Sequence, residues 1–223
     1  MIIDFKKTLV IAPHLDDETI ALGGTIKKLA NNKIKINVVI VGGHLPPIYN
    51  EKSYQITKKE SEKALKILGV KKVNYLDIPA LEFHKQYYNT LNSKINNLIN
   101  NFNPTTVFIP FPDRHIDHRT IFDCAMVNTR PNKKNYPKFV LSYETLSETH
   151  WNAPYIEPNF NPDFFVNIDD TIKEKIKALN CYQSQIKNNQ SRSIQAIKAL
   201  ARFRGSRIGV KYAEAFMLIM AIN

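Results

Sequence analysis

The N-terminal half of this chain alternates short β-branched, apolar runs with segments whose apolar residues recur at helical spacing. The expected strands cover residues 8–12, 34–41, 73–76 and 105–109, and the expected helices cover 19–31, 55–68, 88–102 and 120–127. Strands separated by helices pair in parallel and carry the helices on both faces of the sheet. The alternation therefore predicts an α/β fold of three layers with a mostly parallel sheet. Ligands bind such sheets beyond the carboxyl ends of the strands.

The second half of the chain is less regular. Strands are expected at 139–143 and 164–168, helices at 172–182 and 193–204, and an ordered loop at 151–163. Asp169 or Asp170 is expected to N-cap the first of these helices, and Gly205 to stop the second. The apolar segment 212–222 fits a helix or a strand. No linker or repeat divides the sequence, which predicts a single domain over residues 1–223.

Two clusters of histidine and carboxylate residues follow expected strands. The first contains His14, Asp16, Asp17 and Glu18, and the second spans residues 113–118. Imidazole and carboxylate together are the ligands expected for a catalytic divalent metal, zinc foremost. Because both clusters stand where a buried strand runs out into a loop, we expect them to form one metal site.

A catalytic metal needs about three protein ligands and an open position, with an ionised carboxylate nearby to take a proton from water. His14, one aspartate and His118 would complete the ligand set, and the other aspartate would be the base. The residues alone leave open which role belongs to Asp16 and which to Asp17. His115 is then free to face the substrate, where an imidazolium can stabilise an oxyanion or protonate a leaving amine.

These clusters resemble the zinc-dependent de-N-acetylases of the LmbE / PIG-L type. That family carries His-Pro-Asp-Asp-Glu after its first strand and His-x-Asp-His after a later one. The corresponding segments here are His14-Leu15-Asp16-Asp17-Glu18 and His115-Ile116-Asp117-His118. Further similar positions are Gly23-Gly24, Glu60, Ala64, Leu68-Gly69, Ser142-Tyr143-Glu144-Thr145 and Tyr212-Ala213-Glu214-Ala215-Phe216.

The resemblance implies an LmbE-like, Rossmann-like fold and an N-deacetylase that releases acetate and a free amine from an N-acetylated amino sugar. It implies one Zn²⁺ per chain, held by His14, Asp17 and His118. It also implies Asp16 as the general base toward the attacking water. His115 would be the electrophilic or acid partner, supported by Asp117.

Three positions depart from the family pattern. Leu15 replaces a proline, which loosens the loop without removing a functional group. Thr57 stands where many members have an arginine, so that a lysine at 58 or 59 would have to make the substrate contact. Asp113 stands where some members have a catalytic tyrosine, and stabilisation of the oxyanion would then depend more on the metal and His115.

The formal net charge of +11 suits an anionic substrate, such as a nucleotide-sugar or a lipid-linked phosphosugar. The residues expected to contact the substrate are Tyr143, Glu144, Trp151 and Arg204. The sequence leaves open the sugar's carrier, a homo-oligomeric state and the replacement of zinc by iron.

Other classes of protein fit less well. No apolar run is long enough for a transmembrane segment, and the N-terminus lacks a secretory pattern. Cys124 and Cys181 fit free thiols in a reducing compartment, so the expected location is cytoplasmic. No nucleic-acid-binding motif accompanies the basic charge, and no nucleic acid is expected as a partner.

Two alternatives to a deacetylase deserve comparison. A catalytically inactive α/β module that binds a nucleotide or a sugar is the main one, although the loop after the first strand lacks the G-x-G-x-x-G pattern of dinucleotide binders. A metal phosphoesterase is the nearest enzymatic rival, but such enzymes usually use two metals and more carboxylates.

Overall fold

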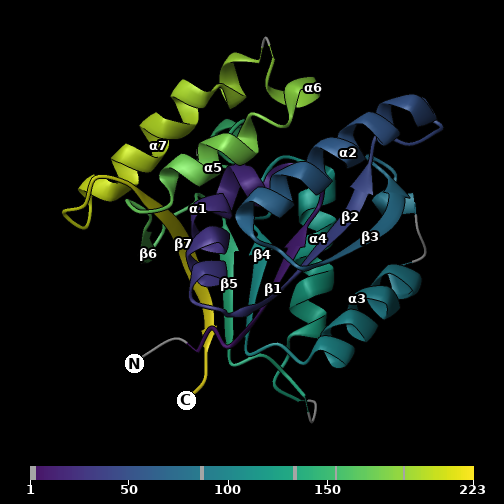
Figure 1. The fold of residues 1–223 in the computed structure, drawn as a ribbon. Helices are drawn as coiled ribbons and strands as arrows, with labels where there is room; N and C mark the ends of the chain where they lie inside the picture. Colours follow the sequence, from purple (N-terminus) through teal and green to yellow (C-terminus); the bar gives the residue numbers. More distant parts are fainter. Residues whose placement is uncertain (1–3, 86–87, 133–134, 154, 188) are drawn as a thin grey trace.

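The computed structural model describes residues 4–85, 88–132, 135–153, 155–187 and 189–223. The described residues form a sheet of seven strands in the order β3-β2-β1-β4-β5-β7-β6 (Figure 1). The strands are β1 (Lys7–Ala12), β2 (Lys35–Gly43), β3 (Lys72–Pro79), β4 (Thr106–Pro110), β5 (Phe139–Tyr143), β6 (Phe164–Asn167) and β7 (Ala213–Ala221). The first five strands pair in parallel, and β7 pairs antiparallel to β5 and β6. The predicted mostly parallel α/β sheet is confirmed.

Helices cover both faces of the sheet (Figure 1). They are α1 (Asp17–Asn31), α2 (Glu51–Leu68), α3 (Tyr88–Phe102), α4 (Ile116–Asn128), α5 (Ile172–Leu179), α6 (Gln183–Ile186) and α7 (Ile194–Ser206), with short 3-10 turns η1 (Phe83–Lys85), η2 (Thr149–Trp151) and η3 (Gln190–Arg192). Alternate residues of β1 face opposite sides, as the period of a strand requires. Val10 and Ala12 pack with α1, α2 and α5, whereas Leu9 and Ile11 pack with α3 and α4. None of the described helices has the length and apolar character needed to cross a bilayer.

Several helix ends differ from the sequence-based expectation. Helix α4 begins at Ile116, four residues earlier than expected, because His115 is its N-cap. The N-cap position of α5 is Thr171, whose side chain makes no capping hydrogen bond, and the side chain of Asp169 accepts the N–H groups of Lys211 and Tyr212 instead. It ends at Leu179, earlier than expected.

The C-terminal region contains the other differences. Gly205 lies inside α7, which continues to Ser206. A Cβ on Gly205 would lie 2.8 Å from the carbonyl oxygen of Val210, so glycine permits a close approach of the chain instead of ending the helix. The segment that fitted either a helix or a strand is strand β7.

Helix α1 is broken in its interior, and a carboxylate from a buried ion pair accepts backbone N–H groups that follow the break. Leu22 has non-helical backbone angles, φ −136° and ψ 25°. The carboxylate of Glu214 accepts the next free N–H groups, those of Gly24 at 2.9 Å and Thr25 at 2.6 Å. Lys175 Nζ lies 2.6 Å from Glu214 Oε1, and both side chains are 3% exposed. Strand β7 and helix α5 therefore hold the part of α1 that follows the break.

Breaking this pair should destabilise the protein, because Lys175→Met leaves the Glu214 charge buried without its cation. We expect the free energy of unfolding to fall by about 3–5 kcal/mol, measured by urea denaturation. Lys85→Met is the matched control, since Lys85 pairs with Glu82 while its own side chain is 61% exposed. That variant should change the free energy by less than about 1 kcal/mol. Equal effects of the two substitutions would contradict this role for the buried pair.

Candidate active site and metal centre

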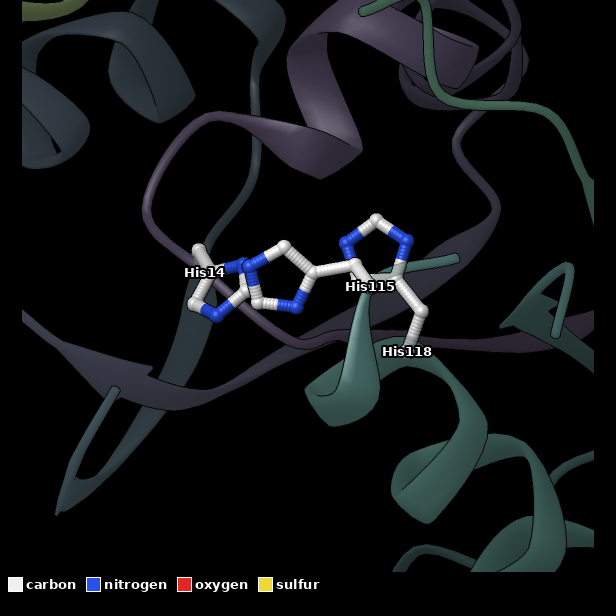
Figure 2. Close-up of side chains that lie close together, drawn as sticks. All are labelled: His14, His115 and His118. Carbon is white, nitrogen blue, oxygen red and sulfur yellow. The ribbon is translucent and has the colours of Figure 1, made fainter. Parts of the chain in front are cut away.

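The two histidine clusters meet at one edge of the sheet. His14 and Asp16 lie in the loop between β1 and α1, and His118 lies in the first turn of α4, which follows β4. Strands β1 and β4 are parallel neighbours, so the segments that follow them emerge side by side. Figure 2 shows the imidazoles of His14, His115 and His118 close together, and their ligand atoms lie within 4.8 Å of one another. This cluster could bind a metal.

Asp17 also belongs to this group. Its Oδ2 lies 3.2 Å from His14 Nδ1 and 3.4 Å from His118 Nε2. Ligands on tetrahedral zinc, with bonds of about 2.0–2.1 Å, are separated by about 3.3–3.4 Å. His118 Nε2 is buried and, within the described part of the chain, has no hydrogen-bond partner. Both observations fit a divalent cation between these three side chains.

Carboxylates also contact the ring nitrogens of His14 and His118 that do not face Asp17. Asp113 Oδ2 lies 3.0 Å from His118 Nδ1, and Asp117 Oδ2 lies 2.9 Å from His14 Nε2. Such contacts fix the ring orientation and raise the basicity of a metal ligand. Asp113 was expected to belong to the second cluster and to depart from the family pattern, but its position behind His118 was not predicted. Asp117 was expected to support His115, whereas its carboxylate contacts His14.

The site favours positive charge at two of its histidines. Burial alone would lower the pKa of His14, but hydrogen bonds to Asp117 and Asp17 raise it to about 9. Burial is likewise outweighed at His118, whose pKa is raised to about 10 by Asp17 and Asp113. The pKa of Asp17 is well below its ordinary value, because the two imidazoles outweigh the effect of its burial. A divalent cation held by neutral imidazoles would supply the same positive charge beside the Asp17 carboxylate.

His115 differs from the other two histidines. Burial, followed by the positive charge of His14 and His118, lowers its pKa to about 4. Its Nδ1 accepts the backbone N–H of Asp117 at 3.2 Å, so the neutral ring carries its hydrogen on Nε2. The structure therefore favours a neutral hydrogen-bond donor at His115 over the imidazolium expected from the sequence.

Asp16 is held by an arginine from the C-terminal part of the chain. Arg192 Nη1 lies 2.9 Å from Asp16 Oδ2, and its other nitrogens bind Glu148 at 3.0 Å and Ser147 at 2.6 Å. Burial raises the pKa of Asp16, although Arg192 acts in the opposite direction. Arg192 was not predicted from the sequence, because 176 residues separate it from Asp16 and η3 carries no recognisable motif.

A pocket of about 410 Å³ opens beside these groups. Asp16, His115 and Arg192 contribute to its wall, together with Lys187 and His44. Its volume lies within the usual range for small-ligand sites. Potential acid, base and metal-binding groups therefore all adjoin a space that can hold a small molecule.

The four expected substrate contacts lie elsewhere, and none of them is among the described residues that line this pocket. Tyr143 is buried and donates its hydroxyl hydrogen to the carbonyl oxygen of Ile11. Glu144 and Arg204 form a bidentate ion pair with each other, at 2.8 and 2.7 Å. Trp151 is exposed on η2.

Comparison with protein families places this site in a known group. The family model described as GlcNAc-PI de-N-acetylase (PIG-L) matches residues 9–128, more than half of the chain. The protein belongs to this family. The matched region contains both histidine clusters, and this agrees with the resemblance inferred from the sequence.

Several proteins named as deacetylases are similar to this PIG-L family member over most of its length. Diacetylchitobiose deacetylase of Thermococcus kodakarensis is 28% identical, covering 98% of this chain and 85% of the relative. A probable N-acetyl-alpha-D-glucosaminyl L-malate deacetylase 2 of Bacillus anthracis is 21% identical, covering 81% of each. The structure of N,N'-diacetylchitobiose deacetylase from Pyrococcus horikoshii, complexed with its inhibitor MPG, has a TM-score of 0.78 at 26% identity, covering 97% of this chain and 84% of that one.

The position of Asp113 behind His118 can be tested by cation binding. We expect Asp113→Asn to weaken Zn²⁺ binding by about 10- to 100-fold, because the charge that orients and polarises the ligand is removed. Titration calorimetry at fixed pH measures this change. Asp123→Asn, an exposed substitution on α4, the helix that carries His118, should leave the affinity unchanged. Wild-type affinity in Asp113→Asn would show that this carboxylate does not support the site.

Proposed function

We propose that this protein is a zinc-dependent hydrolase that removes the acetyl group from an N-acetylated amino sugar. One zinc per chain would be held by His14, Asp17 and His118. The observation that carries this proposal is the single Asp17 oxygen placed between two imidazole nitrogens, next to a pocket lined by a second aspartate. When bound, zinc would polarise the amide carbonyl and make water more acidic.

Asp16 is proposed as the general base. It lines the pocket, and Arg192 fixes its Oδ2, so one edge of the carboxylate is held in place. Within the described residues, no protein group donates a hydrogen bond to Oδ1. This oxygen is therefore available to accept a proton from the attacking water as the water oxygen bonds to the amide carbon.

His115 is proposed to bind the oxygen of the scissile amide. Its Nε2–H can donate a hydrogen bond as negative charge develops on that oxygen. The backbone N–H of Asp117 keeps the ring in this tautomer. When the carbon–nitrogen bond breaks, the proton taken up by Asp16 would pass to the leaving nitrogen, which gives acetate and a free amine.

The substrate class rests on the relatives. The names of the proteins from Thermococcus, Bacillus and Pyrococcus all describe deacetylases of N-acetylated sugars. A catalytically inactive binding module is less well supported, because the proposed ligands, base and hydrogen-bond donor are all present around one pocket.

A screen for acetate release tests the activity directly. Purified protein should release acetate from at least one compound among N-acetylated monosaccharides, oligosaccharides, nucleotide-sugars and lipid-linked sugars. A chelator should abolish the release, and added Zn²⁺ should restore it. Absence of acetate with every substrate, in protein containing one zinc per chain, would contradict the proposed function.

The separate roles of the two adjacent aspartates can be tested with Asp16→Asn. This variant should keep one zinc per chain and lose about two to four orders of magnitude in kcat, as expected for the loss of a general base. Metal analysis and initial rates on the same sample give both quantities. His14→Ala serves for comparison and should lose the metal as well as the activity. Full activity in Asp16→Asn would assign the base to another group.

A further inference from the structure

The pocket beside the histidines continues into a second one. The second pocket, called the outer pocket here, has a volume of about 270 Å³. It shares His44, Tyr49, Ser184 and Gln185 with the first pocket and extends to Ile56 and Thr57 on α2. The first pocket alone is large enough for a small-ligand site. The outer pocket can therefore hold a part of the substrate that lies beyond the N-acetylated sugar.

Uncharged groups line the outer pocket. Among the described residues, no lysine, arginine, aspartate or glutamate contributes to its wall. Burial also lowers the pKa of His44, which keeps this ring neutral near pH 7. Carboxylate and phosphate groups are usually bound by arginine or lysine, and neither faces this space.

The cations of the first pocket and of the adjoining part of α2 do not line the outer pocket. Lys187 lines the first pocket but not the outer one. Arg192 is bound to Asp16 and Glu148 in the first pocket. Lys58, which follows Thr57 on α2, lies 3.3 Å from Asp77. None of these cations lines the outer pocket, in contrast to the anionic substrate expected from composition.

The lining offers an aromatic surface and free polar groups. The rings of Tyr49 and His44 are in contact, with centroids 4.5 Å apart and planes at 60°. Neither the Tyr49 hydroxyl nor the His44 ring nitrogens form a hydrogen bond to any described residue. Thr57 donates its hydroxyl hydrogen to backbone carbonyl oxygen in α2 and is not a free donor toward the pocket. Ile56 supplies an apolar edge. Apolar ring faces combined with a few hydrogen-bonding groups suit a sugar ring.

We propose that the outer pocket binds a neutral sugar unit joined to the N-acetylated sugar. The substrate is then an uncharged oligosaccharide of at least two units, and sugars with an anionic substituent are poor substrates. This rests on the proposed deacetylase function and adds to it the chemistry of the group attached to the reacting sugar.

Three substrates distinguish the possible occupants of the outer pocket. The value of kcat/KM should be at least about tenfold higher for N,N'-diacetylchitobiose than for N-acetylglucosamine or for N-acetyl-α-D-glucosaminyl L-malate. A tenfold ratio corresponds to about 1.4 kcal/mol of additional transition-state binding. An equal rate with the monosaccharide, or a preference for the malate compound, would overturn the assignment of the outer pocket. If neither these three compounds nor any other N-acetyl sugar released acetate, the proposed function itself would be contradicted.

Substitutions at Ile56 link the preference to this pocket. Ile56 is 45% exposed on α2, so larger side chains there need not disturb the core. Ile56→Trp should lower kcat/KM for the disaccharide at least about fivefold more than for the monosaccharide, and Ile56→Arg should raise the malate-to-disaccharide ratio. Ile208→Trp is the matched control, since Ile208 is 41% exposed and belongs to neither pocket. If kcat/KM fell by the same factor for all substrates in both Ile56 variants, the inference would be contradicted.

Discussion

The site depends on one carboxylate oxygen that lies between two imidazoles. Asp17 begins α1, and its Oδ2 faces His14 from the preceding loop and His118 from α4. These three side chains come from segments that follow β1 and β4, adjacent parallel strands of the sheet. The order of the strands therefore brings together residues that are about a hundred positions apart in sequence. A crossover that separated β1 from β4 would separate the ligands as well.

Several charged groups around this oxygen are paired with a group of opposite charge. Unpaired charges in a protein interior are very costly, whereas paired and hydrogen-bonded charges persist. Asp113 faces His118, Asp117 faces His14, and Arg192 faces Asp16. The Lys175–Glu214 pair acts similarly at the break in α1, where its carboxylate accepts the N–H groups of Gly24 and Thr25. The same network leaves His118 Nε2 without a hydrogen-bond partner among the described residues, which suits metal ligation.

The sequence predicted the features that depend on local pattern. Hydrophobic periodicity located the alternating strands and helices, and the paired clusters identified the family and the position of the site. The start of α4 was misplaced because the imidazole of His115 caps that helix, which a hydrophobic pattern cannot reveal. Arg192 and the role of Asp113 were missed because both depend on contacts formed only in the folded chain. Tyr143 has a conspicuous motif, yet it faces the core.

The most direct test of the proposed metal centre is a crystal structure of the zinc-loaded protein with anomalous diffraction data at the zinc edge. His14, Asp17 and His118 should each place one atom within about 2.0–2.2 Å of a single anomalous peak, with His115 facing the pocket. A peak ligated by His14, His115 and His118, with Asp17 outside bonding distance, would contradict the central claim. That result would remove His115 from contact with the substrate and leave both adjacent aspartates as candidates for the base.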